Sequence, residues 1–385
     1  MREVAIVGIG QTPVDEHWEK SLRELAGEAI LAAIADAECS NIEAIYIGNM
    51  MSGSLNHQDQ LGPLIADWAG LRGVETFKIE SACGSGAAAI RAGLMAVGSG
   101  ALSCVIAMGV EKMSDTPIDE TTSALASAAD ADWESSQGIS FVALNALIMQ
   151  RYMYEYHWSH GDFAPFSINA HHNALTNPKA RLRMEINRAQ YERADMICDP
   201  INLLDASPTG DGAAAVVLLP AEKLRGSKRP IITIAGSGSA TDSITIPFRR
   251  DALWLSAAYR ASQTAYTQAG VSAKDIDFFE LHDAFSIMAA LSLEACGFAE
   301  RGQGPRLGLE GEICIGGRIP VATMGGLKAR GHPVGATGVY QVVEAVQQLR
   351  GTAGPNQVEN ARIAMTQNIG GSGSNITTHI LKRLN

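Results

Sequence analysis

The chain has 385 residues, of which 46% are hydrophobic and 18% charged, and its mean hydropathy is +0.03. The net charge of −11 argues against a nucleic-acid partner, because phosphate backbones are bound by clustered Lys and Arg. No apolar run reaches the ~18 residues that suggest a membrane span, and no signal peptide precedes the first predicted strand. We expect a cytoplasmic protein of two or three domains, without nucleic acid or membrane as partner.

Short apolar runs alternate with helical patterns along the first part of the chain, which indicates a layered α/β fold. The predicted elements, in chain order, are strand Val4–Val7, helix Ser21–Ala37, strands Ile45–Ile47 and Phe77–Glu80, helix Gly84–Gly98 and strand Cys104–Met108. From 111 to 205 strand signals are weak, and His, Met, Trp and Tyr are frequent. We interpret this range as a mostly helical insertion that crosses the top of the first half, in the position of a substrate lid.

The second part of the chain repeats the order of the first. Its predicted elements are strand Pro230–Ala235, helix Ser256–Gly270, strand Asp275–Leu281, helix Gly335–Leu349 and strand Ala361–Met365. Two similar halves predict a pseudo-twofold unit with a site near the seam between them. Two prolines bound the junction 220–230, so we place the N-terminal half at 1–224 and the C-terminal half at 230–385.

Cys83 lies where a predicted strand turns into a predicted helix, and its neighbours Ala82, Gly84 and Ser85 are small. Small neighbours let the backbone turn sharply and leave the sulfur exposed at the helix N-terminus, as in the nucleophile elbow of serine enzymes. The helix dipole there favours the thiolate, so we expect a pKa below the ~8.5 of a free thiol. On local sequence alone, a cysteine that only fits a crowded turn remains an alternative.

His332 is held between Gly331 and Pro333, just before the helix Gly335–Leu349. An isolated loop histidine of this kind would carry no functional weight. Its position in the repeat changes that, because it begins the helix that matches the one begun by Cys83. The two side chains should therefore face each other across the seam, as a nucleophile and its base.

Two further segments, 282–283 and 368–374, follow predicted strands near the seam. His282 and Asp283 follow the strand Asp275–Leu281, where His282 would polarise a thioester carbonyl or hold a water and Asp283 would cap the next helix. A capped turn with a hydrogen-bonded histidine is the alternative. Residues 368–374, Asn-Ile-Gly-Gly-Ser-Gly-Ser, leave backbone N–H groups free for an oxyanion, unless they only form a tight strand connection.

Other kinds of site have weaker support. The segment 8–12 lacks the third glycine of a dinucleotide fingerprint, and the chain contains no Walker motif. Histidines 157, 160, 171 and 172 lie close in sequence but form no HExxH pattern, and the six cysteines have no zinc-like spacing. We therefore expect no metal ion and no cofactor.

Taken together, these segments resemble the thiolase family, and the resemblance covers nearly the whole chain. The matching segments are VAIVGIGQT at 4–12, ESACGSGAA at 80–88, HHNALTNP at 171–178, HDAF at 282–285 and GGLKARGHPVGATG at 325–338. The form is most similar to archaeal and sterol-carrier-type thiolases, in which His-Asp replaces Asn-Glu. The resemblance implies the five-layered αβαβα thiolase fold, with two pseudo-twofold related halves and a helical loop insertion.

The resemblance also implies an acyl-CoA C-acyltransferase, most similar to enzymes that condense two acetyl-CoA to acetoacetyl-CoA or catalyse the reverse thiolysis. Cys83 would carry the acyl group, His332 would generate its thiolate, and His282 would polarise the second thioester. The oxyanion hole would consist of the backbone N–H groups of Cys83 and Gly370, beside Asn368. The insertion would hold much of the CoA, and the individual side chains expected to contact substrate are Ser239, His172 and Met288.

The chain departs from the family pattern at the second catalytic cysteine. Biosynthetic thiolases carry it where Asn368 stands, sterol-carrier-type enzymes often carry it where Ala284 stands, and no motif places Cys314 nearby. Three alternatives therefore stay open. They are a decarboxylating ketosynthase with a Cys-His-His set, a sterol side-chain-type retro-aldolase that uses Tyr340 or Tyr154, and a non-catalytic scaffold for other CoA enzymes.

By resemblance, the chain should assemble as a homodimer or homotetramer. Archaeal-type members also resemble subunits of a larger complex, in which a small OB-fold, zinc-ribbon acyl-CoA-binding protein completes the CoA site beside hydroxymethylglutaryl-CoA synthase. Acyl-CoA thioesters are the expected substrates.

Overall fold

The computed structural model describes residues 2–224 and 226–385, and a mixed sheet of nine strands runs through it in the order β3-β2-β4-β7-β1-β8-β11-β10-β9. These strands are β1 (Val4–Gln11), β2 (Ala44–Gly48), β3 (Glu75–Ile79), β4 (Val105–Glu111), β7 (Gly212–Pro220), β8 (Ile232–Thr241), β9 (Phe278–Glu280), β10 (Ile363–Gly370) and β11 (Asn375–Arg383). Two short strands, β5 (Met196–Cys198) and β6 (Ile201–Asn202), pair separately.

The sheet consists of two half-sheets with the same internal order. The first contains β2-β4-β7-β1 and the second β9-β10-β11-β8, and in each the first pair is parallel while the other two are antiparallel. β3 extends the first half-sheet at its outer edge, parallel to β2. β1 and β8 join the half-sheets through only two residue pairs, Ala5 with Thr233 and Ile6 with Ile232. The predicted pseudo-twofold repeat is therefore present. The bounds 1–224 and 230–385 of the two halves stay predictions.

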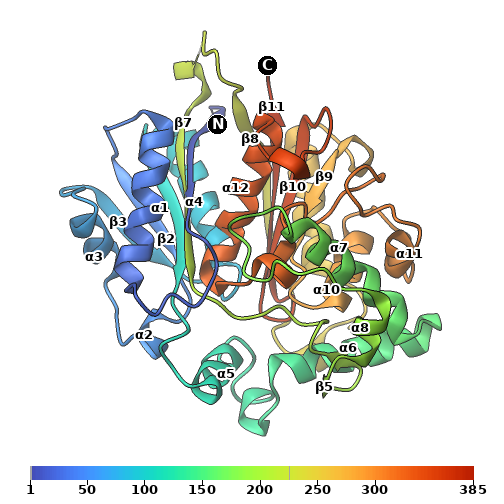
Figure 1. Cartoon of the computed structure of the whole chain (residues 1–385). Coiled ribbons are helices and arrows are strands. Elements are labelled where there is room, and N and C mark those ends of the chain that lie inside the picture. Colours follow the sequence, from blue (N-terminus) through green and yellow to red (C-terminus); the bar gives the residue numbers. More distant parts are fainter. Residues whose placement is uncertain (1, 225) are drawn as a thin grey trace.

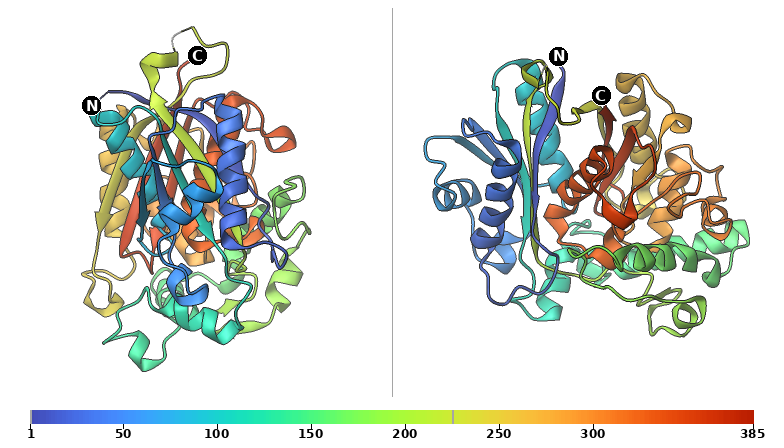
Figure 2. Two further views of the ribbon diagram at one scale, coloured as in Figure 1. Left: turned by 90° about the vertical axis from the view of Figure 1, so that its left-hand side faces the viewer. Right: turned by 45° about the horizontal axis from the view of Figure 1, so that its top comes forward.

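Helices cover both outer faces and fill the space between the half-sheets (Figure 1). α4 (Ser85–Ser99) and α12 (Thr337–Arg350) pack against each other in the middle, as the views of Figure 2 also show. α1 (Leu22–Ala37) covers the first half-sheet from outside, and α9 (Ser256–Ala269) covers the second. The resulting order of helix, sheet, helix, sheet and helix confirms the predicted five-layered thiolase fold.

Local sequence signals explain where the layer helices begin and end. Ser21 and Glu24 form a capping box at the start of α1, so two of its free backbone N–H groups have partners. α4 ends at Gly100 and α12 at Gly351, both with the positive φ of a left-handed cap, 89° and 74°. The helix ends of the repeat are thus set by residues visible in the sequence.

The remaining helices lie in the connections, and none of the described helices is long and apolar enough to span a membrane. They are α2 (Ser52–Leu55), α3 (Leu61–Trp68), α5 (Ile118–Ala126), α6 (Phe141–Tyr156), α7 (Ala164–Ala174), α8 (Arg188–Arg193), α10 (Ser286–Ala295) and α11 (Gly304–Leu309).

The range 111–205 is mostly helical, as predicted. Its helices α6 and α7, however, pack against the second half and not over the first. α6 and α7 pack against α10 and α11 of the second half, while α5 lies below the first half (Figure 1). Leu144, Met149 and Phe166 are buried in one core with side chains of the second half. The expectation that the insertion crosses the top of the first half is therefore wrong for α6 and α7, because their apolar faces are buried against the other half.

Candidate active site

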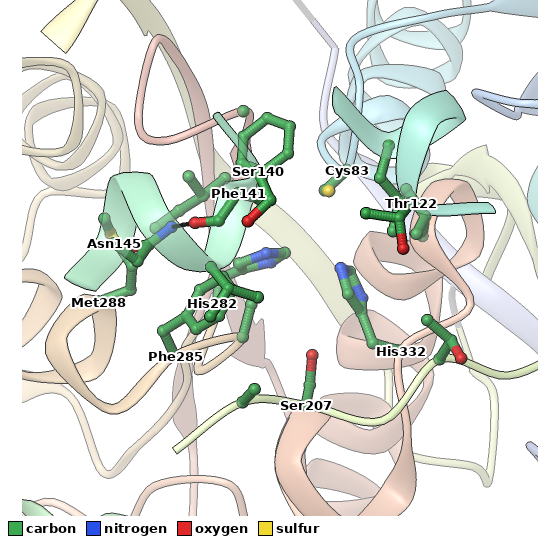
Figure 3. A pocket seen from close by; sticks show the side chains of 18 residues that line it. Cys83, Thr122, Ser140, Phe141, Asn145, Ser207, His282, Phe285, Met288 and His332 are labelled. Atoms are coloured by element: carbon green, nitrogen blue, oxygen red, sulfur yellow. Dashed lines mark hydrogen bonds between the residues drawn. The ribbon is translucent and has the colours of Figure 1, made fainter. Parts of the chain in front are cut away.

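Cys83 lies in the turn between β3 and α4, at the seam of the two halves (Figure 3). Ala82 has a φ of +49°, which is strained for a residue with a side chain and marks a sharp reversal of the backbone. The turn is held by hydrogen bonds from the Gly84 N–H to the Ser81 carbonyl, 2.8 Å, and from the Ser85 hydroxyl to the Ala82 carbonyl, 2.6 Å. The sulfur is thereby presented at the first turn of α4.

His332 precedes α12 and has a defined hydrogen-bond partner. Its Nδ1 lies 2.6 Å from the Thr337 hydroxyl oxygen, and that hydroxyl donates to the carbonyl of Pro333 at 3.3 Å. Since the hydroxyl proton is used in this way, the oxygen accepts the Nδ1–H of His332. The other ring nitrogen, Nε2, then carries a free lone pair and can act as a base.

His282 follows β9 and faces His332 edge to face, with ring centroids 5.1 Å apart and an interplanar angle of 86°. The Nδ1 of His282 lies 3.0 Å from the side-chain nitrogen of Asn368. One donor atom from each of Cys83, His282 and His332 lies within 4.8 Å of the other two. The structure thus brings together the three side chains that the sequence singled out from three separate segments.

The three side chains point into a cavity with a volume of about 970 Å³, including its part open to solvent (Figure 3). Its wall is mostly apolar, and α5 and α6 of the insertion form one side. The cavity is lined by Cys83, Thr122, Leu125, Ser140, Phe141, Val142, Asn145, Ala206, Ser207, Thr209, His282, Ala284, Phe285, Met288, His332, Val334, Ile369 and Gly371. An apolar pocket with a few convergent polar groups is typical of a small-molecule site.

Burial controls protonation at this site. Burial and the nearby Glu111 carboxylate raise the pKa of the Cys83 thiol to about 12, so the expected lowering by the helix dipole is wrong. Burial, together with the positive charge of Arg330, lowers the pKa of His332 to about 3. Burial and the neighbouring His332 lower the pKa of His282 well below its usual range. At neutral pH, a protonated thiol therefore faces two uncharged imidazoles.

Glu111 is a buried carboxylate at the end of β4 that the sequence reasoning did not single out as functional. It accepts hydrogen bonds from the backbone N–H groups of Met50 and Met51, both 3.0 Å, and of Gly335, 2.8 Å. The side chain of Asn49 also donates to it, at 2.8 Å. Glu111 therefore ties the first half to the loop between His332 and α12. The sequence signal that could have identified Glu111 is a single carboxylate at the end of the otherwise apolar strand β4.

The loop predicted to supply the oxyanion hole lies against the Cys83 turn. A Cβ added at Gly370 would lie 2.5 Å from the carbonyl oxygen of Ser81, so only glycine allows this approach. The neighbours Ile369 and Gly371 line the cavity, and Asn368 contacts His282 behind it. This placement is what an oxyanion hole from Cys83 and Gly370 would need, and that role stays a prediction.

The three predicted substrate contacts lie in different places. Met288 lines the cavity with Cys83. Ser239 lies on β8, accepts a hydrogen bond from Thr377 at 3.0 Å and is not among the lining residues. His172 is exposed on α7 and lines a separate cavity of about 1450 Å³. Only Met288 is therefore positioned to touch an acyl group bound to Cys83.

The set of Cys83, His282 and His332 is also the one group of at least three Cys, His, Asp or Glu residues, within 2–224 and 226–385, that is spaced to hold a metal ion. The histidines at 157, 160, 171 and 172 form no such group among these residues. Zinc binds a cysteine as its thiolate. The same spacing of one thiol and two imidazoles also suits a nucleophile with its base.

A cysteine at a strained strand–helix turn, with two neutral imidazoles in an apolar cavity, has the components of a thiol nucleophile and its base. Sequence comparison gives the family. Residues 4–222 match the family described as "Thiolase, N-terminal domain", and residues 238–383 match "Thiolase C-terminal domain-like". The chain belongs to the thiolase family.

Individual members of the family are similar to this chain over its full length. The acetyl-CoA acetyltransferase of Methanothermobacter thermautotrophicus is 44% identical over all of both chains, and that of Methanocaldococcus jannaschii is 38% identical over 99% of each. The solved structure of an "Ltp2-ChsH2(DUF35) aldolase" matches 99% of this chain and 98% of its own with a TM-score of 0.87 and 26% identity. Human mitochondrial 3-ketoacyl-CoA thiolase has the same fold, with a TM-score of 0.75 at 17% identity over 100% and 99% of the chains.

Proposed function

We propose that the protein is an acetyl-CoA acetyltransferase that joins two acetyl-CoA into acetoacetyl-CoA and CoA, or catalyses the reverse thiolysis. The observation that carries this proposal is the approach of Cys83, His282 and His332 to within 4.8 Å of one another in an apolar cavity. Two relatives that match over essentially the whole chain bear the same name. The apolar side chains of Phe141, Phe285 and Met288 suit a short acyl group.

The first half-reaction follows from the protonation states of the site. The Sγ of Cys83 attacks the thioester carbon of acetyl-CoA, while the Nε2 of His332 takes the thiol proton. The tetrahedral intermediate collapses, the bond to the CoA sulfur breaks, and His332 returns its proton to the departing CoA thiolate. Because thiol and imidazole start uncharged, the proton moves as the sulfur attacks and no preformed ion pair is needed.

The second half-reaction forms the carbon–carbon bond. A base of the site takes a proton from C2 of the second acetyl-CoA, and the resulting enolate carbon attacks the acetyl carbonyl on Cys83. The bond to the Cys83 sulfur then breaks, which releases acetoacetyl-CoA. His282 lies beside the nucleophile, where its ring can stabilise the negative charge on the second thioester oxygen.

The retro-aldolase alternative has one argument in its favour, the similarity to the Ltp2-ChsH2(DUF35) aldolase. The two tyrosines proposed for that chemistry do not support it. Tyr340 is fully buried with its hydroxyl bonded to Thr12, and Tyr154 is 76% exposed. Neither lines the cavity that contains Cys83. A ketosynthase would use the same Cys-His-His set, but family membership favours the thiolase reaction.

We further propose that a partner protein completes the CoA site. The segment 113–140 forms one wall of the cavity through Thr122, Leu125 and Ser140, and contains no Lys or Arg. Its acidic residues are Asp115, Asp119, Glu120, Asp130, Asp132 and Glu134. The phosphates of CoA need cations, so this wall would repel them. The similar aldolase combines Ltp2 with ChsH2(DUF35), which supports a partner here, and an OB-fold, zinc-ribbon protein would supply the missing charge.

We also propose a homo-oligomer, and hydroxymethylglutaryl-CoA synthase as an enzyme that would take the product in a larger complex. β3 is the edge strand of the sheet, and its Phe77 is 57% exposed, which supports a second copy at this edge.

Purified protein should be assayed in both directions, by the loss of acetoacetyl-CoA in the presence of CoA and by the formation of acetoacetyl-CoA from acetyl-CoA. We expect turnover in both assays and none for Cys83→Ala. Turnover that survives in Cys83→Ala would contradict the proposed function. A parallel assay with a candidate CoA-binding partner should lower the KM for CoA thioesters without changing which residue is essential.

A further inference from the structure

We propose that Asn368 is a positioning residue that fixes His282 as a hydrogen-bond donor and thereby leaves His332 as the base for both proton transfers. This inference rests on the proposed acetyl transfer and deepens it. It concerns the missing second catalytic cysteine of this chain, because Asn368 and Ala284 occupy the two positions where thiolases carry that thiol. Asn368 takes the place of that thiol without its chemistry, since an amide cannot exchange a proton with carbon.

The orientation of the Asn368 amide decides what His282 can do. Both residues are buried, with 1% and 2% of their surfaces exposed, and the Nδ2 of Asn368 lies 3.0 Å from the Nδ1 of His282. An amide nitrogen only donates, so Nδ1 must accept and the proton of the ring resides on Nε2. With the amide reversed, its oxygen would accept from Nδ1–H, and Nε2 would become a base.

The surroundings of the amide oxygen, Oδ1, explain why the Asn368 amide does not adopt the orientation with its oxygen and nitrogen exchanged. The Oδ1 of Asn368 has no hydrogen-bond partner among the described residues and lies against the first turns of α4 and α12. A Cβ added at Gly338 would lie 2.3 Å from this oxygen and 2.4 Å from the backbone nitrogen of Ala87. Helix N-termini carry partial positive charge, which attracts a carbonyl oxygen and repels an NH₂ group. The two central helices therefore orient the amide.

His332 has the opposite tautomer, because Thr337 accepts its Nδ1–H and leaves Nε2 unprotonated. The remaining polar side chains that line the cavity are hydroxyls and one amide, which are poor bases at neutral pH. These side chains belong to Thr122, Ser140, Asn145, Ser207 and Thr209. Once Cys83 is acetylated, His332 is the one group of the described lining that can take a proton from carbon.

The condensation step then balances with these groups alone. The Nε2 of His332 takes a proton from C2 of acetyl-CoA, and the C–H electron pair forms an enolate whose oxygen accepts the Nε2–H of His282. The enolate carbon bonds to the acetyl carbon on Cys83, and the carbon–sulfur bond breaks. The Cys83 thiolate takes the proton back from His332. The site ends with a neutral thiol and a neutral imidazole, ready for the next acetyl-CoA.

The direct test is nitrogen NMR of the full-length protein with ¹⁵N-labelled histidine, with the His282 signals assigned by their loss in His282→Gln. We expect a protonated Nε2 and an unprotonated Nδ1 for His282, and the reverse for His332. A protonated Nδ1 on His282 would overturn the inference. This measurement needs no substrate or turnover, so it can fail while the acetyltransferase activity stands, or succeed while that activity is absent.

Two variants provide the kinetic test. In Asn368→Ala the His282 ring loses its fixed tautomer, and we expect condensation to slow by about 10²-fold, the scale of losing one oxyanion donor. Formation of acetyl-Cys83 should stay within about threefold, because His332 is untouched. Asn145→Ala is the matched control, since Asn145 lines the same cavity but donates to the Phe141 carbonyl. Its His282 tautomer signals should equal those of wild type. If Asn368→Ala slowed acetyl-Cys83 formation and condensation equally, the proposed positioning role would be wrong and Asn368 would have only a structural role.

Discussion

The two halves of the molecule place their central helices alike but stabilise them differently. α4 follows the Cys83 turn, and the residues it buries are small or apolar apart from Ser85. α12 is buried along nearly its whole length and includes Glu344, which pairs with Arg330 at 2.8 Å between two fully buried side chains. Arg330 itself ends a π-helical turn, Gly326–Arg330, just before His332. The helix after Cys83 thus buries no charged side chain, whereas the helix after His332 buries a carboxylate that pairs with Arg330.

The difference between the two helices matches the different requirements of Cys83 and His332. A cysteine nucleophile needs a sharp turn and space at a helix N-terminus, which small residues provide. The His332 imidazole must be held in one orientation and one tautomer, and the loop that carries it is anchored by buried charges and by Thr337. The same fold supports both demands, because the repeat sets the helices while the loops before them set the chemistry.

Among the changes that leave Cys83 in place, the largest effect should come from removing the base. His332→Ala takes away the proton acceptor of both half-reactions, and we expect turnover to fall by ~10²–10⁴-fold in each, the usual range for general acid–base catalysis. Single-turnover measurements of acetyl-Cys83 formation and of condensation would check this. A loss confined to one half-reaction would show that another group serves the other.

His282→Ala should separate the half-reactions. It removes an oxyanion donor, so we expect condensation to fall by ~10²–10³-fold while acylation changes much less. Rapid-quench kinetics with acetyl-CoA, followed by a second addition of acetyl-CoA to the isolated acetyl-enzyme, would resolve the two rates. Equal losses in both steps would contradict the assignment.

The charged anchor of the second half should matter for stability. Burial raises the pKa of Glu344 to about 8, so above that pH Glu344→Gln leaves the Arg330 guanidinium without its buried counter-charge, and we expect a loss of ~3–5 kcal/mol in the free energy of unfolding. Glu155→Gln is the matched control, because the Arg151–Glu155 pair is exposed on α6 and should contribute less than ~1 kcal/mol. Denaturant titration of both variants would test the difference. Similar losses in both would contradict it.

The smallest effect should be that of pH on acylation. The pKa of His332 is lowered to about 3 and that of Cys83 is raised to about 12, so neither group changes charge between these values. We expect kcat/KM for acetyl-Cys83 formation to stay nearly constant from about pH 6 to 9, because the neutral pair persists across that window. A profile that rises with a midpoint near the ordinary histidine value of ~6.5 would show a normally titrating base.

Much of the fold and part of the site are visible in the sequence. The repeat, the strand–turn–helix around Cys83 and the matching place of His332 follow from local patterns of apolar, small and glycine residues. These patterns act over a few residues, so a sequence displays them directly. β7 and β11 were not predicted, although both are largely buried strands at the centre of their half-sheets.

What was missed depends on contacts between distant segments. Glu111 is held by N–H groups of residues 49–51 and 335, and Asn368, though expected near the oxyanion hole, contacts His282, 86 positions away, which no local pattern shows. The direction of the Cys83 pKa depends on burial, which outweighs the local helix dipole. The packing of α6 and α7 likewise depends on which apolar face of the other half is free to receive them.

The most direct test of the account is intact-mass spectrometry of wild type and Cys83→Ala after incubation with acetyl-CoA and, separately, with acetoacetyl-CoA. We predict one acetyl adduct on wild type from either substrate and none on Cys83→Ala, with CoA binding to the variant retained. An adduct that persists on Cys83→Ala, or no adduct on wild type from either substrate, would contradict the claim that Cys83 carries the acyl group.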